Sequence, residues 1–170
     1  MIERDGVEQL SLAQVAAALG IKAPSLYRHV ASKTALIAAV NTWTSQELFG
    51  AFQRALAEAD RDPTARLGAI FHAQRRFAHA NPRTYVLMFT TADNEQRANA
   101  EMLEQQALPI QAIMALLVGA ERALTALRGA LALVHGFVML ELNAQFQRGG
   151  DLDAAFEATI SAYLAGWSNR

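Results

Sequence analysis

The 170-residue sequence lacks cysteine and has few charges and few chain breakers. Without cysteine it has no disulfide, no thiolate metal ligand and no cysteine nucleophile. Charged residues make up 18% of the sequence and hydrophobic residues 52%, which excludes an intrinsically disordered chain. Proline (4) and glycine (10) are scarce, whereas alanine, the strongest helix former and a poor strand former, is abundant. We therefore expect an all-α protein with a sizeable core.

Acidic residues are absent from one long N-terminal stretch. Residues 9–46 contain no Asp or Glu but hold three basic residues, among them Lys22 and Lys33, the only lysines of the sequence. The rest of the chain has twelve basic and sixteen acidic residues, so the net charge of −1 conceals a basic N-terminal segment. Such a patch is typical of a surface that meets an anionic partner such as nucleic acid, although an alanine-rich stretch can also lack acids by chance.

Features of an export signal or a membrane span are also missing. Residues 1–5 are charged and include no apolar segment. The longest apolar run, residues 129–140, is interrupted by His135 and is too short to cross a bilayer. We expect a cytoplasmic protein in which this run forms a core helix.

Start and stop signals place helices along most of the sequence. Ser11 begins a capping-box pattern, Gly20 ends the helix that follows, and Ile21 is expected to be buried after the turn. Pro24 suits the first position of a second, short helix, and Asp151 caps the last one. Between them we expect helices at residues 33–59, 64–80, 82–89, 95–117 and 121–148, with the last helix ending near residue 167.

The two short N-terminal helices and the turn at residues 19–22 form a helix-turn-helix pattern. A recognition helix enters the major groove by its N-terminal end, so small or polar residues suit its first turn. Tyr27, Arg28 and His29 are expected to point outward toward phosphates or base edges. Lys33 lies beside the N-terminus of the next helix, where a phosphate binds well. An ordinary helical hairpin with a solvated face fits the same pattern, so the pattern alone leaves both readings open.

A longer motif is more specific. Residues 12–36 resemble the DNA-binding signature of the TetR/AcrR family of transcriptional regulators. The distinctive core of this signature is Leu26-Tyr27-Arg28-His29-Val30 followed by Ser32-Lys33 and Leu36. Residues 81–89 and the sequence Leu133-Val134-His135-Gly136-Phe137-Val138 resemble a C-terminal regulatory domain of the same family.

The resemblance implies an all-α homodimer with a DNA-binding domain at residues 1–40 and a ligand-binding and dimerisation domain at residues 41–170. The first domain would bind a near-palindromic operator, and a small effector in the second would release it. Among the DNA-facing positions, Arg28 is expected to contact a base, and Tyr27 and Lys33 are expected to contact phosphates. The residues of this sequence that match the family's DNA-facing positions are Lys22, Ala23, Pro24, Ser25, Tyr27, Arg28, His29 and Lys33.

Apolar residues of the middle helices are the candidates for an effector pocket, and their character favours a lipophilic ligand. They are Trp43, Phe71, Met88, Phe89, Met102 and Phe137, with Arg75 and Tyr85 as polar anchors. A stripe of aromatic residues and methionines also fits a plain core, so that alternative stays open for each residue. The spacing of the histidines does not favour a metal site, and we expect neither a metal nor a cofactor.

The last two long helices are more apolar than a monomer surface tolerates. We expect part of this surface to be buried within the subunit and part across a dimer, where the resemblance implies a four-helix interface. The residues assigned to the interface are Ala132, His135, Met139, Asn143, Ile160, Tyr163, Leu164 and Trp167.

The start of the sequence departs from the family pattern. Family members begin with a full amphipathic helix, whereas residues 2–6 correspond to its last turn. We therefore expect that most of the first helix is missing, through a truncation, a start placed too late or an omitted segment. Leu10, Leu12, Val15 and Leu26 would then lose a packing partner, and burial of such a side chain is worth about 1.5–3 kcal/mol. A true truncation would predict weak or no operator binding.

Three classes of function follow. The first is a ligand-responsive DNA-binding regulator. The second is a helical dimerisation protein that sequesters a ligand or partner without binding DNA, because the first helix is missing. The third is an enzyme, which is disfavoured because the sequence shows no glycine-rich phosphate loop, no carboxylate pair with a base and no metal cluster.

Overall fold

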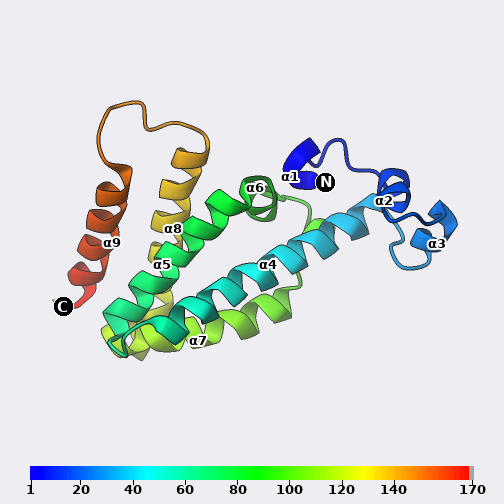
Figure 1. Ribbon diagram of the computed structural model, residues 1–170. Helices are drawn as coiled ribbons and strands as arrows, with labels where there is room; N and C mark the ends of the chain where they lie inside the picture. Colours follow the sequence, from blue (N-terminus) through cyan, green and yellow to red (C-terminus); the bar gives the residue numbers. More distant parts are fainter. Residues whose placement is uncertain (169–170) are drawn as a thin grey trace. The chain divides into compact units, whose positions relative to one another are not determined.

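The computed structural model describes residues 1–168, and every regular element in that range is a helix (Figure 1). The predicted all-α fold class is confirmed. In chain order the elements are α1 (Ile2–Asp5), α2 (Leu12–Ala18), α3 (Ala23–Tyr27), α4 (Lys33–Glu58), α5 (Pro63–Ala80), α6 (Pro82–Thr90), the 3-10 helix η1 (Asn94–Gln96), α7 (Ala100–Val118), α8 (Ala120–Leu142) and α9 (Leu152–Ser168).

The chain forms two compact units that are not continuous in sequence. The first unit comprises residues 1–47 and 81–103, and the second comprises residues 48–80 and those from 104 onward. Helix α6 and η1 therefore group with the N-terminal helices, although α5 precedes them in the chain. The domain boundary expected at residue 40 lies inside α4 and stays a prediction.

Most predicted helices occur within one or two residues of their expected bounds, but α8 is shorter than predicted. It ends at Leu142 instead of residue 148. The Asn143 side chain donates to the Met139 carbonyl over 2.7 Å, and the next residue, Ala144, adopts a positive φ of 52°. The Gln145 backbone N–H then donates to the Leu140 carbonyl over 2.8 Å, which closes the helix end.

Helix α7 also differs, because it begins at Ala100 and not near residue 95. The chain first makes the short η1, and the Asn99 side chain then accepts from the Met102 backbone N–H over 2.8 Å. An Asn that accepts from the third N–H ahead is an N-terminal cap, so the local hydrogen bond moves the start of the helix.

The core of the first unit contains two clusters of buried residues. Ile2 of α1 packs with Leu10 and with Ile37 of α4, and Leu12 packs with Leu26 of α3. Of the four side chains expected to lose a packing partner, Leu10, Leu12 and Leu26 are only 5–7% exposed, so the expectation is wrong for them. Val15 is half-buried and packs against both clusters. The single turn of α1 supplies Ile2, which covers Leu10.

The core of the second unit lies between α5, α8 and α9, which contact one another (Figure 1). Helix α8 turns three small residues inward, and Ala123, Ala126 and Ala130 are at most 1% exposed. Small side chains let the neighbouring helices approach closely. Ile160 and Leu164 of α9 are each 2% exposed, so they belong to the core of one chain and not to the surface for a partner to which we assigned them.

Helix α8 is also long and apolar enough to cross a membrane by length and composition. Its most apolar window has a mean hydropathy of 1.7, and 28% of that window is buried. The buried side faces α5 and α9, as expected of a core helix. Leu124 and Leu131, seven residues apart on one side of the helix, are 42% and 47% exposed, and Leu140 on another side is 43% exposed.

Candidate nucleic-acid interface and ligand pocket

Helix α2 and the turn after it are fixed by local hydrogen bonds. The Ser11 hydroxyl accepts from the Gln14 backbone N–H over 3.2 Å, which confirms the predicted cap. Gly20 has a φ of +67°, and the Ile21 N–H donates back to the Ala16 carbonyl over 3.0 Å. A residue with a side chain would be strained by about 1 kcal/mol or more at this φ, so the turn needs glycine.

The apolar residues of this turn lie on the outside. Ile21 is 41% exposed and Leu19 is 61% exposed, so the expectation that Ile21 is buried is wrong. The space between α2 and α3 is already filled by Leu12, Ala16 and Leu26, which form one cluster.

Helix α3 packs against α2 (Figure 1) and leaves Pro24 and Tyr27 exposed. Leu26 is its buried residue, whereas Tyr27 is 53% exposed. All eight predicted DNA-facing residues belong to the first unit, on α3, its flanks and the start of α4. Ala23 and Ser25 are half-buried, and the exposed ones are Lys22, Pro24, Tyr27, Arg28, His29 and Lys33.

Two of the cations make hydrogen bonds to neutral groups. Arg28 Nη2 donates to Ser25 Oγ over 3.2 Å, and Lys33 Nζ donates to the Glu8 carbonyl over 3.3 Å. In the described part of the chain, no ion pair involves Lys22, Arg28 or Lys33. The positive charge of this surface is therefore not neutralised from within, and it is available to a phosphate backbone.

An apolar groove of about 430 Å³ lies within the first unit. Trp43, which we assigned to the effector pocket, is 55% exposed and lines this groove together with residues of α1 and α2. The lining residues are Met1, Ile2, Glu3, Leu10, Val15, Ala18, Leu19, Leu36, Val40, Trp43, Asn81 and Thr84.

The Glu3 side chain binds the start of helix α6. Its carboxylate accepts from the Arg83 backbone N–H (3.0 Å) and from the Thr84 backbone N–H (2.7 Å) and hydroxyl (2.6 Å). Burial alone would raise the pKa of Glu3, but these hydrogen bonds outweigh it and lower the pKa below its ordinary value. A negative charge at this place also suits the helix dipole. No local sequence pattern indicates this contact, because 80 residues separate Glu3 from Arg83.

Asn41 binds the segment that follows α6. Its side-chain N–H group donates to Thr91 Oγ1 over 3.1 Å and to the Gln96 carbonyl over 2.8 Å. Within the first unit, α6 and its exit are thus fastened to α1 and to α4 by side chains that the sequence reasoning missed. A polar residue on a predicted core face was the available signal for Asn41, which is 0% exposed.

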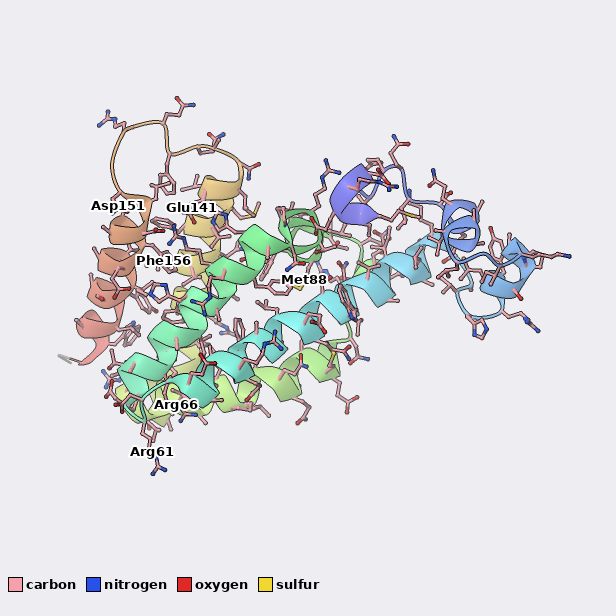
Figure 2. The ribbon with its side chains drawn as sticks, in the orientation of Figure 1. Arg61, Arg66, Met88, Glu141, Asp151 and Phe156 are labelled. Atoms are coloured by element: carbon pink, nitrogen blue, oxygen red, sulfur yellow. The ribbon has the colours of Figure 1, made fainter. Side chains whose placement is uncertain are left out.

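The predicted pocket residues divide between the two units. The first unit holds Trp43, Tyr85, Met88, Phe89 and Met102, and the second holds Phe71, Arg75 and Phe137. In the first unit the rings of Tyr85 and Phe89 lie 4.8 Å apart, and Met88 on α6 (Figure 2) accepts a hydrogen bond from the Ser45 hydroxyl over 3.0 Å.

Three polar side chains are buried beside Met88 or one turn away on α4. Asn41, Thr44 and Ser45 are at most 1% exposed. Among the residues that the structure describes, Asn41 Oδ1 and Thr44 Oγ1 find no hydrogen-bond partner. Buried polar atoms are normally paired, so these two atoms are further candidates for contact with a polar group of a ligand or with water.

Arg75 joins three helices of the second unit. It makes two hydrogen bonds to Glu141 of α8, of 2.9 and 2.6 Å, and an ion pair of 2.7 Å to Asp153 of α9. Its guanidinium also lies 4.9 Å from the Phe156 ring; Figure 2 shows Glu141 on α8 and Phe156 on α9. The hydrogen bonds to Glu141 raise the pKa of Arg75. Arg75 is therefore a structural cross-link and not the free polar anchor that we expected.

The histidines of α5 also bind carboxylates of neighbouring helices. His72 Nε2 lies 2.7 Å from Glu157, and His79 Nε2 lies 3.2 Å from Glu141. Residues 1–168 contain no group of three His, Asp or Glu side chains placed to hold a metal ion. His135 takes part in neither of these ion pairs, and its burial lowers the pKa of its side chain.

Two family models match this chain. Residues 1–40 match the model described as bacterial regulatory proteins, tetR family, and residues 67–163 match the model of the tetracyclin repressor-like C-terminal domain. The second match alone covers more than half of the sequence. The chain belongs to the TetR family.

Relatives of this TetR-family chain are similar over nearly its whole length. The HTH-type transcriptional regulator YobS of Bacillus subtilis (strain 168) is 25% identical over 96% of this chain and 85% of its own. The HTH-type transcriptional regulator Rv0681 of Mycobacterium tuberculosis (strain ATCC 25618 / H37Rv) is 29% identical over 99% of this chain and 77% of its own. A solved structure of a protein of unknown function from Rhodococcus sp. RHA1 has a TM-score of 0.83 at 25% identity, covering 98% of this chain and 89% of its own.

Six of the residues assigned to the dimer interface of this TetR-family chain remain outside the core. Ala132 and Asn143 are exposed, and the other four are half-buried: His135, Met139, Tyr163 and Trp167. Tyr163 has a contact within the chain as well, since its hydroxyl donates to the Ala126 carbonyl over 2.6 Å. Their role at an interface stays a prediction.

Proposed function

We propose that this protein is a transcriptional repressor that binds a near-palindromic DNA operator as a homodimer in the cytoplasm and is released by a small lipophilic effector. The observation that carries the proposal is the tetR-family match at residues 1–40. Within these residues, the exposed cations of α3 and its flanks form no ion pair with an acidic residue of the described chain. Membership of a family of regulators, and relatives that are HTH-type transcriptional regulators, support DNA binding and a regulatory role, and they do not point to an enzyme.

The DNA contacts follow from exposure and side-chain length. Tyr27 and Lys33 are exposed and each offers a donor to a phosphate, as do Lys22 and His29. Ala23, Pro24 and Ser25 are small enough to let the first turn of α3 approach the bases. Arg28 has the reach and the donors for a base edge.

The dimer is supported by the unpartnered side of α8. Leu124 and Leu131 are seven residues apart on one side of this helix and more than 40% exposed. A stripe of exposed leucines on a core helix is the surface expected at a helix-bundle interface. A homodimer of a helix-turn-helix protein matches an operator with twofold symmetry.

The effector pocket is supported by the surroundings of α6. Tyr85, Met88 and Phe89 place apolar and aromatic side chains on α6, and Asn41 and Thr44 of α4 each hold a buried polar atom without a hydrogen-bond partner in the described chain. A mostly apolar lining with few polar groups favours a lipophilic molecule with one or two hydrogen-bonding groups.

A dimerisation protein without DNA binding is not favoured. That alternative required a loosened helix-turn-helix, whereas Leu10, Leu12 and Leu26 are buried. Ser11 and Ser32 also cap their helices, and Gly20 forms the turn with a positive φ. The sequence match at residues 1–40 adds to this.

A gel shift with the DNA upstream of the protein's own gene tests the proposal. We expect a discrete complex and a symmetric footprint, and loss of both in a double variant Lys22→Ala/Lys33→Ala. An Arg61→Ala/Arg148→Ala variant removes the same charge from exposed sites outside the first unit and serves as the control. Equal loss in both variants, or no complex with any promoter DNA, would contradict the proposal.

A further inference from the structure

We propose that Arg28 reads a guanine in each operator half-site and that Ser25 positions the Arg28 side chain; this inference rests on the proposed function. Arg28 is the C-terminal cap residue of α3 and is exposed. Its Nη2 donates to Ser25 Oγ, three residues earlier, over 3.2 Å. This bond brings the guanidinium back along the helix toward its first turn, the end that a recognition helix inserts into the major groove.

The remaining donors of Arg28 are available. A guanidinium carries five N–H donors, and its recorded bond in the described chain, to Ser25, uses one of them. Residues 9–46 contain no carboxylate, and no ion pair of the described chain involves Arg28. Arg75 shows the opposite case, because two carboxylates occupy its guanidinium. DNA therefore has no internal acid to displace before it binds Arg28.

The chemistry of the guanidinium selects guanine among the bases. Guanine presents two adjacent acceptors, N7 and O6, in the major groove, and two parallel N–H groups of arginine match them. Adenine replaces one of these acceptors with a donor, so it forms one bond fewer and opposes the second N–H. Tyr27 and Lys33 lack the planar fork and bind phosphate oxygens equally well at any sequence. Arg28 is therefore the specificity-determining residue of this surface.

Selection of operators from randomised duplexes tests the inference with the full chain. We expect the wild-type motif to contain a guanine at one position of each half-site, in inverted orientation. Replacing that guanine with 7-deazaguanine removes the N7 acceptor and should weaken binding about 10- to 100-fold. Arg28→Ala removes every donor at this position, so its motif should lose the guanine and its affinity should no longer respond to 7-deazaguanine.

Two further variants separate positioning from general binding. Ser25→Ala should keep the guanine in the motif but reduce the 7-deazaguanine effect severalfold, because the side chain is no longer held; an unchanged ratio would overturn the role of Ser25. Arg148→Ala, which removes the same charge at an exposed position between α8 and α9, should leave the motif unchanged. Arg28 is exposed and Ser25 is half-buried, so we expect each variant to fold, and circular dichroism checks this.

The outcomes distinguish this inference from the proposed function. If the wild type selects an operator and the guanine preference survives in Arg28→Ala, the role of Arg28 is overturned while the proposed function stands. If the wild type selects no sequence at any salt concentration, the proposed function fails and this inference fails with it.

Discussion

Glu141 and Asp153 bind the same guanidinium of Arg75 but differ greatly in exposure. Their side chains are 4% and 87% exposed, and the Arg75 side chain is 14% exposed. Removing one partner of a buried ion pair leaves an uncompensated charge, whereas an exposed ion pair contributes little because water and salt screen it. The geometry in the second unit therefore predicts very different effects for two chemically similar changes.

We expect Glu141→Gln to lower the free energy of unfolding by about 3 kcal/mol, the lower end of the range for a broken buried pair, because Asp153 still binds Arg75. Asp153→Asn should lower it by less than about 1 kcal/mol. Urea unfolding of the three proteins measures both values. Equal effects of the two changes would show that Glu141 is not the principal partner.

Glu141 also predicts how stability depends on pH. Burial would raise the pKa of Glu141, but the hydrogen bonds from Arg75 and His79 outweigh burial and lower it. A carboxyl whose pKa is lower in the folded state stabilises the fold above its unfolded pKa of about 4.5, and this contribution is lost as the pH falls through the folded pKa. In urea unfolding at several pH values, wild-type stability should therefore fall more steeply below about pH 4.5 than that of Glu141→Gln. Glu3 and Glu157 also have lowered pKa values. The stability of Glu141→Gln should therefore still fall as the pH is lowered, but with a smaller slope than that of the wild type.

At the scale of elements, α8 and α9 meet where Gly129 faces Tyr163. A Cβ atom added at Gly129 would clash with the Tyr163 hydroxyl and lie 3.2 Å from the ring carbon Cζ. That hydroxyl donates to the Ala126 carbonyl one turn earlier on α8, so Tyr163 cannot move without losing the bond. Glycine is required here by close approach and not by its backbone conformation.

Gly129→Ala should therefore lower the melting temperature, at a cost of about 1–3 kcal/mol for the overpacked contact. Gly136→Ala on the same helix is the matched control, because a Cβ there meets no atom within 4 Å and helix propensity gains up to about 1 kcal/mol. In a Tyr163→Phe background the clash with the hydroxyl is gone, and the cost of Gly129→Ala should shrink. A cost that is unchanged in that background would place the strain elsewhere.

The elements that the sequence predicts well are those with local causes. Ser11 caps α2 and Asp151 caps α9 through bonds to N–H groups two or three residues ahead, so both could be read from the sequence. Glu3 contacts Arg83 of α6, 80 positions away, and Arg75 contacts Glu141, 66 positions away. No periodic pattern in the sequence predicts contacts between residues so far apart. The same limit explains why Ile160 and Leu164 were assigned to a dimer surface, because an apolar helix face does not tell which helix covers it.

For the candidate site, one contiguous motif carries the predicted DNA-facing residues, and six of the eight are exposed, but their contacts with DNA stay predictions. The pocket assignments also stay predictions, because their residues come from helices distant in sequence and an aromatic stripe looks alike in a core and in a pocket. Trp43 shows this, since it lines a groove with α1 and α2 in the first unit.

At the scale of the whole molecule, the exposed side of α8 predicts the oligomeric state. Leu131→Glu places a charge at one of the two exposed leucines on this side of α8, where burial of an unpaired charge in a dimer is strongly unfavourable. We expect the wild type to sediment as a dimer and Leu131→Glu as a monomer. Leu116→Glu on α7, at a leucine that is 71% exposed, is the control and should remain a dimer. Dissociation by Leu116→Glu but not by Leu131→Glu would move the interface to α7.

Specific recognition of DNA by the surface of α3 is the property on which the proposed function depends. It can be measured by fluorescence anisotropy with a duplex from upstream of the protein's own gene and with a shuffled duplex, each at about 50 and 200 mM salt. We expect the genuine sequence to bind at least about 1,000-fold more tightly than the shuffled one, and both affinities to fall steeply with salt. Equal affinity for the two duplexes, or binding that is insensitive to salt, would contradict it.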